Sequence, residues 1–227
     1  MRTAWFYIFL LYVLTSCGND GQPGGSLDHW NIRNEYDSLG REALERDTGQ
    51  WTEILEEEGS IVIDMPYASM DNFTGKQLYP CARCFLRTDA AEAFYKGVHA
   101  LNEKGFVVKV LDCYRPRRVQ NLLHEALPDA YYFAGPMKTE FHNNGLSVDL
   151  TLMDARGRRL DMGSDYNHFG PASFHEYQEV SDEAKQRRAL IMSTLRPLGF
   201  QAMKSRWWQY NFRWTNAPSE DIIWYCQ

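Results

Sequence analysis

A histidine and an aspartate stand seven positions apart in the segment His142-Asn143-Asn144-Gly145-Leu146-Ser147-Val148-Asp149. The histidine precedes a glycine at which the chain can turn, and the aspartate lies within the apolar stretch that follows. A turn there can fold both side chains toward one metal ion, since imidazole nitrogen and carboxylate oxygen are both zinc ligands. We therefore take His142 and Asp149 as candidate metal ligands.

Arg115 is a candidate for stabilising negative charge. It stands between Tyr114 and Pro116, directly after the apolar run 106–111. An arginine held in this way is a fixed fork of N–H donors that can face an oxygen gaining negative charge in a reaction. We expect Arg115 to be catalytic.

A third segment carries polar side chains among aromatic ones: Ser205-Arg206-Trp207-Trp208-Gln209-Tyr210. It lies in an aromatic-rich C-terminal part of the chain. We interpret most of these aromatic residues as packing in the core or along a groove.

Strands are predicted near all three segments. Apolar runs indicate buried strands over 60–65 and 106–111, and an aromatic strand over 206–214. Alternation of apolar and polar residues predicts a half-buried strand over 146–152. Residues 28–58 are polar, and we expect them to be helical in part.

Two helices are predicted between these strands. One is capped by Asp89 and runs to about residue 104, where Gly105 ends it. The other follows a Ser181 cap from 182 to about 198. This order indicates an α+β fold: a single domain with a central antiparallel or mixed sheet and flanking helices.

The segments resemble the motifs of one family, the D-alanyl-D-alanine dipeptidases of the vancomycin-resistance type, which are zinc peptidases. The resemblance covers about 51–214 and implies a D-Ala-D-Ala peptidase-like fold. The early loop of the family is matched by Asn72-Phe73-Thr74-Gly75, and its D-A-Y-R-P motif by Asp112-Cys113-Tyr114-Arg115-Pro116. Its H-x-x-G-x-x-x-D-L-T-L motif is matched by His142 to Leu152, and its D-M-G segment by Asp161-Met162-Gly163-Ser164. Its G-F-x5-E-W-W-H ending is matched in part by Gly199-Phe200 with Trp207-Trp208. The resemblance implies that Arg115 stabilises the transition state and that His142 and Asp149 bind zinc.

The last motif departs from the family. Where the family has the general-base Glu and the third zinc ligand, a His, this chain has Arg206 and Gln209. Arginine stays protonated and cannot act as a base, and a glutamine amide oxygen is a poor substitute for imidazole. We therefore expect zinc to be weakly held or absent.

Other residues are open candidates for rescuing the site. Glu140, two residues before His142, can pair with Arg206 or serve as a replacement ligand. His168, His175 and Glu176 are further candidates for a third ligand. The sequence does not choose among them.

The first residues indicate export. Arg2 is followed by the apolar run Ala4 to Leu14, which is shorter than the roughly 20 residues of a membrane-spanning helix. Leu14-Thr15-Ser16-Cys17 resembles a bacterial lipobox, in which Cys17 would be lipidated. The predicted organisation is a leader over 1–17, a flexible tether over 18–27, and a dipeptidase-like domain over 28–227. We expect a lipid-anchored protein of the cell envelope, with its domain in the periplasm or at the cell surface.

Cysteines and net charge narrow the remaining alternatives. The envelope is oxidising, so the later cysteines can form disulfides, whose pairing the sequence leaves open: Cys81, Cys84, Cys113 and Cys226. The CxxC spacing of Cys81 and Cys84 favours a structural role over redox or metal chemistry. The net charge of −6 argues against nucleic acid as a partner, and the membrane is expected to be contacted through the lipid alone.

Three hypotheses for function follow. The first is a degenerate peptidase that binds D-Ala-D-Ala or a related cell-wall peptide without cleaving it. The second is an active zinc D-Ala-D-Ala dipeptidase with a rearranged site. The third is a structural or partner-binding lipoprotein that does not use the cleft.

Overall fold

The computed structural model describes residues 50–129, 131–135, 138–213, 217–224 and 226. The predicted leader, Cys17, the tether and most of the region 28–58 lie outside these residues. Within the described ranges, no helix combines the length and apolar character needed to cross a membrane.

A five-stranded mixed sheet forms the centre of the domain, in the order β2-β4-β5-β7-β6. The β2–β4 pair is parallel and the other neighbours are antiparallel, which confirms the predicted α+β fold with a mixed sheet. The strands are β2 (Ile61–Ile63), β4 (Phe106–Asp112), β5 (Ser147–Asp154), β6 (Phe200–Ala202) and β7 (Gln209–Phe212). A separate antiparallel pair is made by β1 (Trp51–Ile54) and β3 (Cys84–Arg87).

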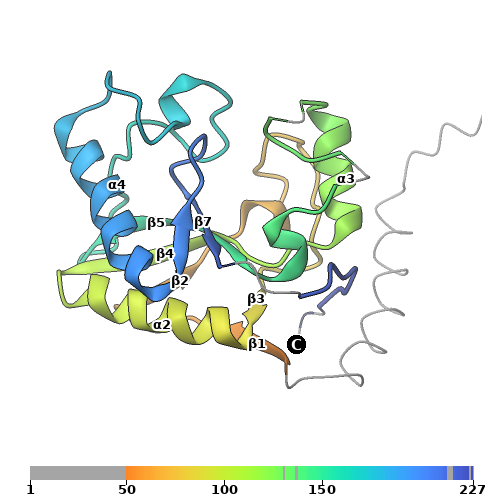
Figure 1. The fold of residues 1–227 in the computed structure, drawn as a ribbon, viewed down its shortest axis with the longest axis horizontal. Helices are drawn as coiled ribbons and strands as arrows, with labels where there is room; N and C mark the ends of the chain where they lie inside the picture. The colour runs from red at the N-terminus through yellow and green to blue at the C-terminus, as the bar shows by residue number, and fades with distance from the viewer. Residues whose placement is uncertain (1–49, 130, 136–137, 214–216, 225, 227) are drawn as a thin grey trace, which may run out of the picture.

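Within the described residues, three α-helices surround the sheets: α2 (Thr88–Asn102), α3 (Arg117–Ala126) and α4 (Asp182–Leu195). Helix α2 packs on β4 and on the β1–β3 pair, while α4 packs against α2 and β6. Figure 1 shows α3 on the opposite side of the molecule from α4. Short 3-10 helices complete the connections: η2 (Pro66–Ala68), η3 (Phe141–Asn144), η4 (Pro171–Ser173) and η5 (Arg196–Leu198).

The predicted helix starts were right in one case and wrong in the other. The Ser181 hydroxyl accepts a hydrogen bond from the Ala184 N–H at 3.2 Å, so the predicted cap of α4 is confirmed. Helix α2 begins at Thr88, and its cap residue is Arg87 rather than Asp89. Asp89 lies in the first turn, where its negative charge favours the helix N-terminus without capping it.

Strand β5 is buried on both faces, and the prediction of a half-buried strand is wrong. It is the central strand of the sheet, and its residues from Ser147 to Leu152 are all buried. The alternating polar residues include Ser147, Asp149 and Thr151. They therefore face the interior of the protein instead of solvent.

The predicted strand over 206–214 is shorter in the structure. Only Gln209–Phe212 forms β7, and Trp214 is not among the described residues. Arg206 to Trp208 belong to a turn, in which the Gln209 N–H donates to the Arg206 carbonyl at 3.2 Å. The turn places Arg206 and Gln209 at the end of β7.

One disulfide joins Cys84 of β3 to Cys113, which follows β4. The two cysteines of the CxxC segment are not bonded to each other, because Cys84 pairs with Cys113 and Cys81 is a free thiol. Cys226 is also free. The disulfide ties the β1–β3 pair to the central sheet at the strand end that leads to Arg115.

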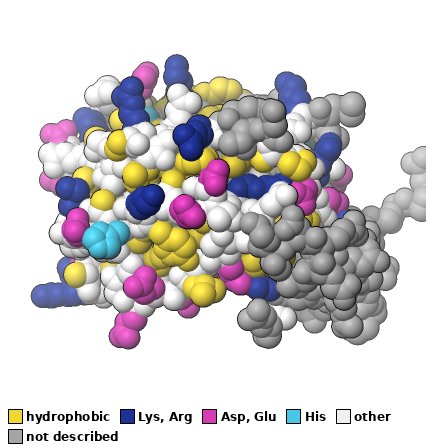
Figure 2. Space-filling model, turned by 60° about the horizontal axis from the view of Figure 1, so that its bottom comes forward, with side chains coloured by type: hydrophobic (Ala, Val, Ile, Leu, Met, Phe, Trp, Pro, Cys, Tyr) yellow, Lys and Arg dark blue, Asp and Glu magenta, His cyan; other side chains and the backbone are white. Residues whose placement is uncertain are grey.

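Basic and acidic side chains are interspersed on the face drawn in Figure 2. Like charges are not gathered there, so their fields partly cancel. The ionisable side chains that matter for chemistry are the buried ones: Arg87, Asp112, Arg115, His142, Asp149, Arg188 and Arg206.

Candidate metal centre

His142 is held on the short 3-10 helix η3, which is capped at both ends. Before it, the Glu140 carboxylate accepts from the backbone N–H of Asn143, and the Asn143 side chain accepts from the Glu140 N–H. After it, Gly145 adopts φ 71°, a left-handed conformation that suits glycine. The sequence between His142 and Asp149 therefore makes the predicted turn, and a capping role explains part of Glu140's position.

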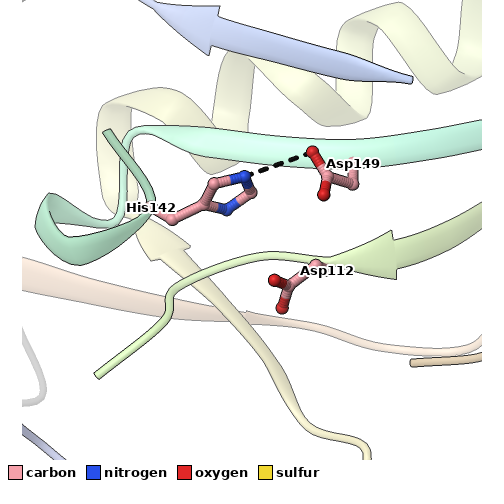
Figure 3. Close-up of side chains that lie close together, drawn as sticks. All are labelled: Asp112, His142 and Asp149. Atoms are coloured by element: carbon pink, nitrogen blue, oxygen red, sulfur yellow. Dashed lines mark hydrogen bonds and ion pairs between the residues drawn. The ribbon is translucent and has the colours of Figure 1, made fainter. Parts of the chain in front are cut away.

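The His142 ring is fixed so that one nitrogen faces Asp149 (Figure 3). Its Nδ1 lies 2.6 Å from the Cys113 carbonyl oxygen, and its Nε2 lies 3.2 Å from Asp149 Oδ1. Because a carbonyl only accepts, the hydrogen of the neutral ring belongs on Nδ1 and the lone pair on Nε2. Two ligands on a tetrahedral zinc ion, with bonds near 2.0–2.1 Å, stand about 3.3 Å apart. The His142–Asp149 spacing therefore fits a shared metal ion.

Asp149 is buried and suited to carry a negative charge. Its second oxygen, Oδ2, accepts a hydrogen bond from the Tyr166 hydroxyl at 2.9 Å. Burial alone would raise its pKa, but His142, Arg115 and Arg206 together hold the pKa of this carboxyl below its ordinary value. The charged carboxylate is the form that binds a metal ion.

Asp112 completes a buried group of potential ligands with His142 and Asp149, whose ligand atoms lie within 4.8 Å of one another. Its oxygens already accept four hydrogen bonds. Oδ1 accepts from the Tyr79 hydroxyl and the Cys113 N–H, and Oδ2 accepts from Arg115 Nε and Nη2 at 3.0 and 2.6 Å. We therefore assign Asp112 to holding Arg115, in the same buried group as the metal ligands.

Arg115 is a fixed fork, as its sequence neighbours predicted. Besides Asp112, it donates from Nη1 to Gln120 Oε1 at 2.8 Å, and it is 1% exposed. These bonds leave one N–H free on each terminal nitrogen. Nη2 lies 4.0 Å from Asp149 Oδ2, so the guanidinium borders the candidate metal ligands.

Gln209 supplies an unpartnered oxygen beside Asp149. The two residues are directly opposite in the β5–β7 ladder, which places their side chains on the same face of the sheet. Gln209 Nε2 donates to Asn211 Oδ1 at 2.9 Å, whereas its Oε1 is buried and has no hydrogen-bond partner. A cation beside Asp149 would satisfy this oxygen. The spacing of His142 Nε2 and Asp149 Oδ1 therefore fits a shared metal ion, and Gln209, opposite Asp149 in the ladder, is our candidate for a further oxygen ligand.

Arg206 lies at the edge of the same group. It is 5% exposed, and its charge is one of those that lower the pKa of Asp149. Its Nη1 lies 3.9 Å from Glu140 Oε2, an ion pair longer than a hydrogen bond. Of the two roles considered for Glu140, the structure shows the pairing with Arg206.

The other candidates for a third ligand are not brought to the site. Among the described residues, the group that could share a metal ion contains neither His168, His175 nor Glu176. The His175 ring packs edge-on against Tyr210, and burial lowers the pKa of His175 to about 4. Glu176 is exposed.

Sequence reasoning missed several partners that hold the site. Tyr79 and Gln120 orient Asp112 and Arg115, and the Cys113 carbonyl orients His142. A backbone carbonyl has no sequence signal. Tyr166, which donates to Asp149, lies just after the Asp161-Met162-Gly163-Ser164 segment. Its position next to this motif was the one sequence signal that it belongs to the site.

The family model and the similar proteins found by comparison all carry the description D-alanyl-D-alanine dipeptidase. Residues 59–221 match the model of a peptidase family described as D-ala-D-ala dipeptidase. The chain is 34% identical to a D-alanyl-D-alanine dipeptidase of Escherichia coli over 148 residues, covering 65% of this chain and 77% of that protein. It is 29% identical to one from Enterococcus faecium, covering 66% and 85%, and 25% identical to one from Streptomyces coelicolor, covering 73% and 93%.

Proposed function

Because the chain belongs to the D-Ala-D-Ala dipeptidase family of peptidases, we propose that it is a metal-dependent hydrolase of D-Ala-D-Ala-type dipeptides with a rearranged site. The observation that carries this proposal is the 3.2 Å spacing of His142 Nε2 and Asp149 Oδ1 in a buried group of ligands. With the Nδ1 hydrogen donated to the Cys113 carbonyl, Nε2 and the carboxylate oxygen face each other, and a cation between them, whether a proton or a metal ion, would stabilise the pair.

Zinc is the metal that the family implies. His142, Asp149 and Gln209 would hold it, and when bound it would supply a Lewis acid and lower the pKa of a coordinated water. The carbonyl of Cys113 fixes the His142 ring, and Tyr166 fixes Asp149. Such outer partners keep ligands in place and support metal affinity.

Arg115 would stabilise the negative charge that develops on the peptide oxygen. Its guanidinium is already held by Asp112 and Gln120, so it needs no rearrangement at the moment of reaction. The reaction also needs a proton acceptor, and Arg206 cannot be one. Glu140, whose carboxylate lies 3.9 Å from Arg206, is our candidate for that role.

Binding of the same peptides without cleavage is the second candidate function. It is favoured by Arg206 and Gln209, which stand where the family has its general base and its third zinc ligand. A weak ligand and a misplaced base would slow hydrolysis while leaving Arg115 in place to bind the peptide. Turnover of the peptide separates the two candidates.

The test is release of D-alanine from D-alanyl-D-alanine by the zinc-loaded protein. We expect release that a chelator abolishes and that His142→Ala abolishes as well. His99→Ala is the matched control, because His99 lies on α2 with a side chain that is 77% exposed. Peptide binding with no release from the wild type would refute hydrolysis and leave the second candidate.

We also propose that the protein is exported and lipid-anchored through Cys17. The support is the short apolar leader, the lipobox-like segment and the Gly-rich stretch that follows. The wild type should partition into the detergent phase, and Cys17→Ser should not. Identical partitioning of both forms would contradict the anchor.

A further inference from the structure

Arg206 is a buried cation with incomplete partners. Its Nε is buried without a hydrogen-bond partner, and the one ion pair that it makes with a described residue, to Glu140, spans 3.9 Å. Burying a charge is costly unless it is paired and hydrogen-bonded. Arg206 therefore retains unused capacity to bind an anion.

The other buried arginines of the described chain do not share this feature. Arg115 donates from all three nitrogens to Asp112 and Gln120. Arg188 donates from all three to backbone carbonyls at 2.7–2.8 Å. Arg87 bonds to backbone carbonyls and to the side chains of Gln50 and Glu220. The incomplete pairing is thus particular to the arginine beside the metal ligands.

Glu140 is restrained from completing the pair. One of its oxygens accepts from the Ala134 N–H at 2.8 Å, and its carboxylate also caps η3 through the Asn143 N–H. Moving closer to Arg206 would break these backbone bonds. Glu140 therefore leaves the guanidinium of Arg206 incompletely paired.

The guanidinium chemistry selects the kind of ligand. Arginine binds a carboxylate through two parallel charge-assisted hydrogen bonds, whereas a neutral amide gains much less from it. We propose that Arg206 makes this site a receptor for the free carboxylate of an amino acid or short peptide. This deepens the proposed function and rests on it, because hydrolysis of D-Ala-D-Ala creates such a carboxylate at the same site. D-Alanine would then stay bound as a product.

The probe pair is D-alanine and D-alaninamide, which differ in the charge of the carboxyl group. Binding to the full chain is measured by calorimetry for the wild type, Arg206→Gln and Arg196→Gln. Arg196 lies on η5, its side chain is exposed, and it is the matched control. We expect the wild type to bind D-alanine roughly 10- to 100-fold more tightly than the amide, the range of a hydrogen bond to a charged group. Arg206→Gln should remove this preference, and Arg196→Gln should keep it.

Equal affinity for acid and amide in the wild type would overturn the inference, as would an unchanged preference in Arg206→Gln. Circular dichroism shows whether each variant is folded. If Arg206→Gln does not fold, Arg206→Lys replaces it. Lysine keeps the charge without the fork, so it should lose most of the preference, and full retention would overturn the inference.

The titrations are run with and without zinc, alongside D-alanine release from D-alanyl-D-alanine. Acid preference without release would support Arg206 as a carboxylate receptor and refute the hydrolase. Release of D-alanine without a preference for the acid would support the hydrolase and refute Arg206 as a carboxylate receptor. The two proposals therefore fail separately.

Discussion

Gly145 lies in the turn after His142 and packs directly against the Trp51 ring. Gly145→Ala should therefore be strongly destabilising. A Cβ at this position would lie 2.2 Å from Trp51 Cζ3 and 2.7 Å from Trp51 Cη2. The Trp51 ring cannot easily yield, because the Arg87 guanidinium lies 4.1 Å above it and Tyr114 packs against it at 4.7 Å. The backbone is also left-handed, with φ 71°.

The expected loss is the sum of two effects. A left-handed backbone costs a residue with a Cβ roughly 1–2 kcal/mol. Forcing extra volume into a packed region costs roughly 1–3 kcal/mol more. We therefore expect Gly145→Ala to lower the free energy of unfolding by about 2–5 kcal/mol. Gly145 follows η3, which carries His142, so a displaced turn would also move this ligand and lower zinc affinity.

Gly157→Ala is the matched control for urea unfolding of both variants. Gly157 has φ 73°, but its Cβ would meet only Met153 Cε, at an ordinary contact distance of 3.6 Å. It should therefore lose only the backbone contribution of roughly 1–2 kcal/mol. A loss in Gly145→Ala no larger than that in Gly157→Ala would refute the packing argument.

Two further predictions concern titratable groups. Burial lowers the pKa of His175 to about 4, so its contribution to stability is present above pH ~6.5 and is lost as the pH falls toward 4. Wild-type unfolding measured from pH 7 to 4 should lose up to about 3 kcal/mol more than His175→Gln, and parallel curves would contradict this. Burial, with contact from Cys226, raises the pKa of Cys81 to about 12. At pH 8 iodoacetamide should therefore alkylate exposed Cys226 faster than Cys81, as read by peptide mass mapping, and equal rates would count against the assignment.

The fold was predictable where local patterns and packing agree. Strand β4 and helix α4 lie close to their predicted positions, because continuous apolar runs and a serine cap are local signals. The β1–β3 pair was not predicted. Its strands are joined by pairing of residues 30 or more positions apart, such as Trp51 with Arg87. Burial of β5 on both faces likewise depends on its neighbours in the sheet rather than on its own alternation.

The site was predictable where a motif is compact. His142 and Asp149 lie together because one turn connects them, and Arg115 is held by Asp112, three residues earlier. The role of Gln209 depends on the register of β7 against β5, which brings it opposite Asp149. Sequence reasoning therefore identified Gln209 as a departure from the family, and only the structure shows that its oxygen is buried and unpartnered and that the residue stands opposite Asp149.

Zinc titration against a competing chelator tests the metal site most directly. We expect one zinc per wild-type chain, loss of binding in His142→Ala, and unchanged binding in His99→Ala. Gln209→His should bind zinc more tightly, because imidazole replaces an amide oxygen at the third ligand. Failure of the wild type to bind one zinc, or equal binding by wild type and His142→Ala, would contradict the metal site proposed for His142, Asp149 and Gln209.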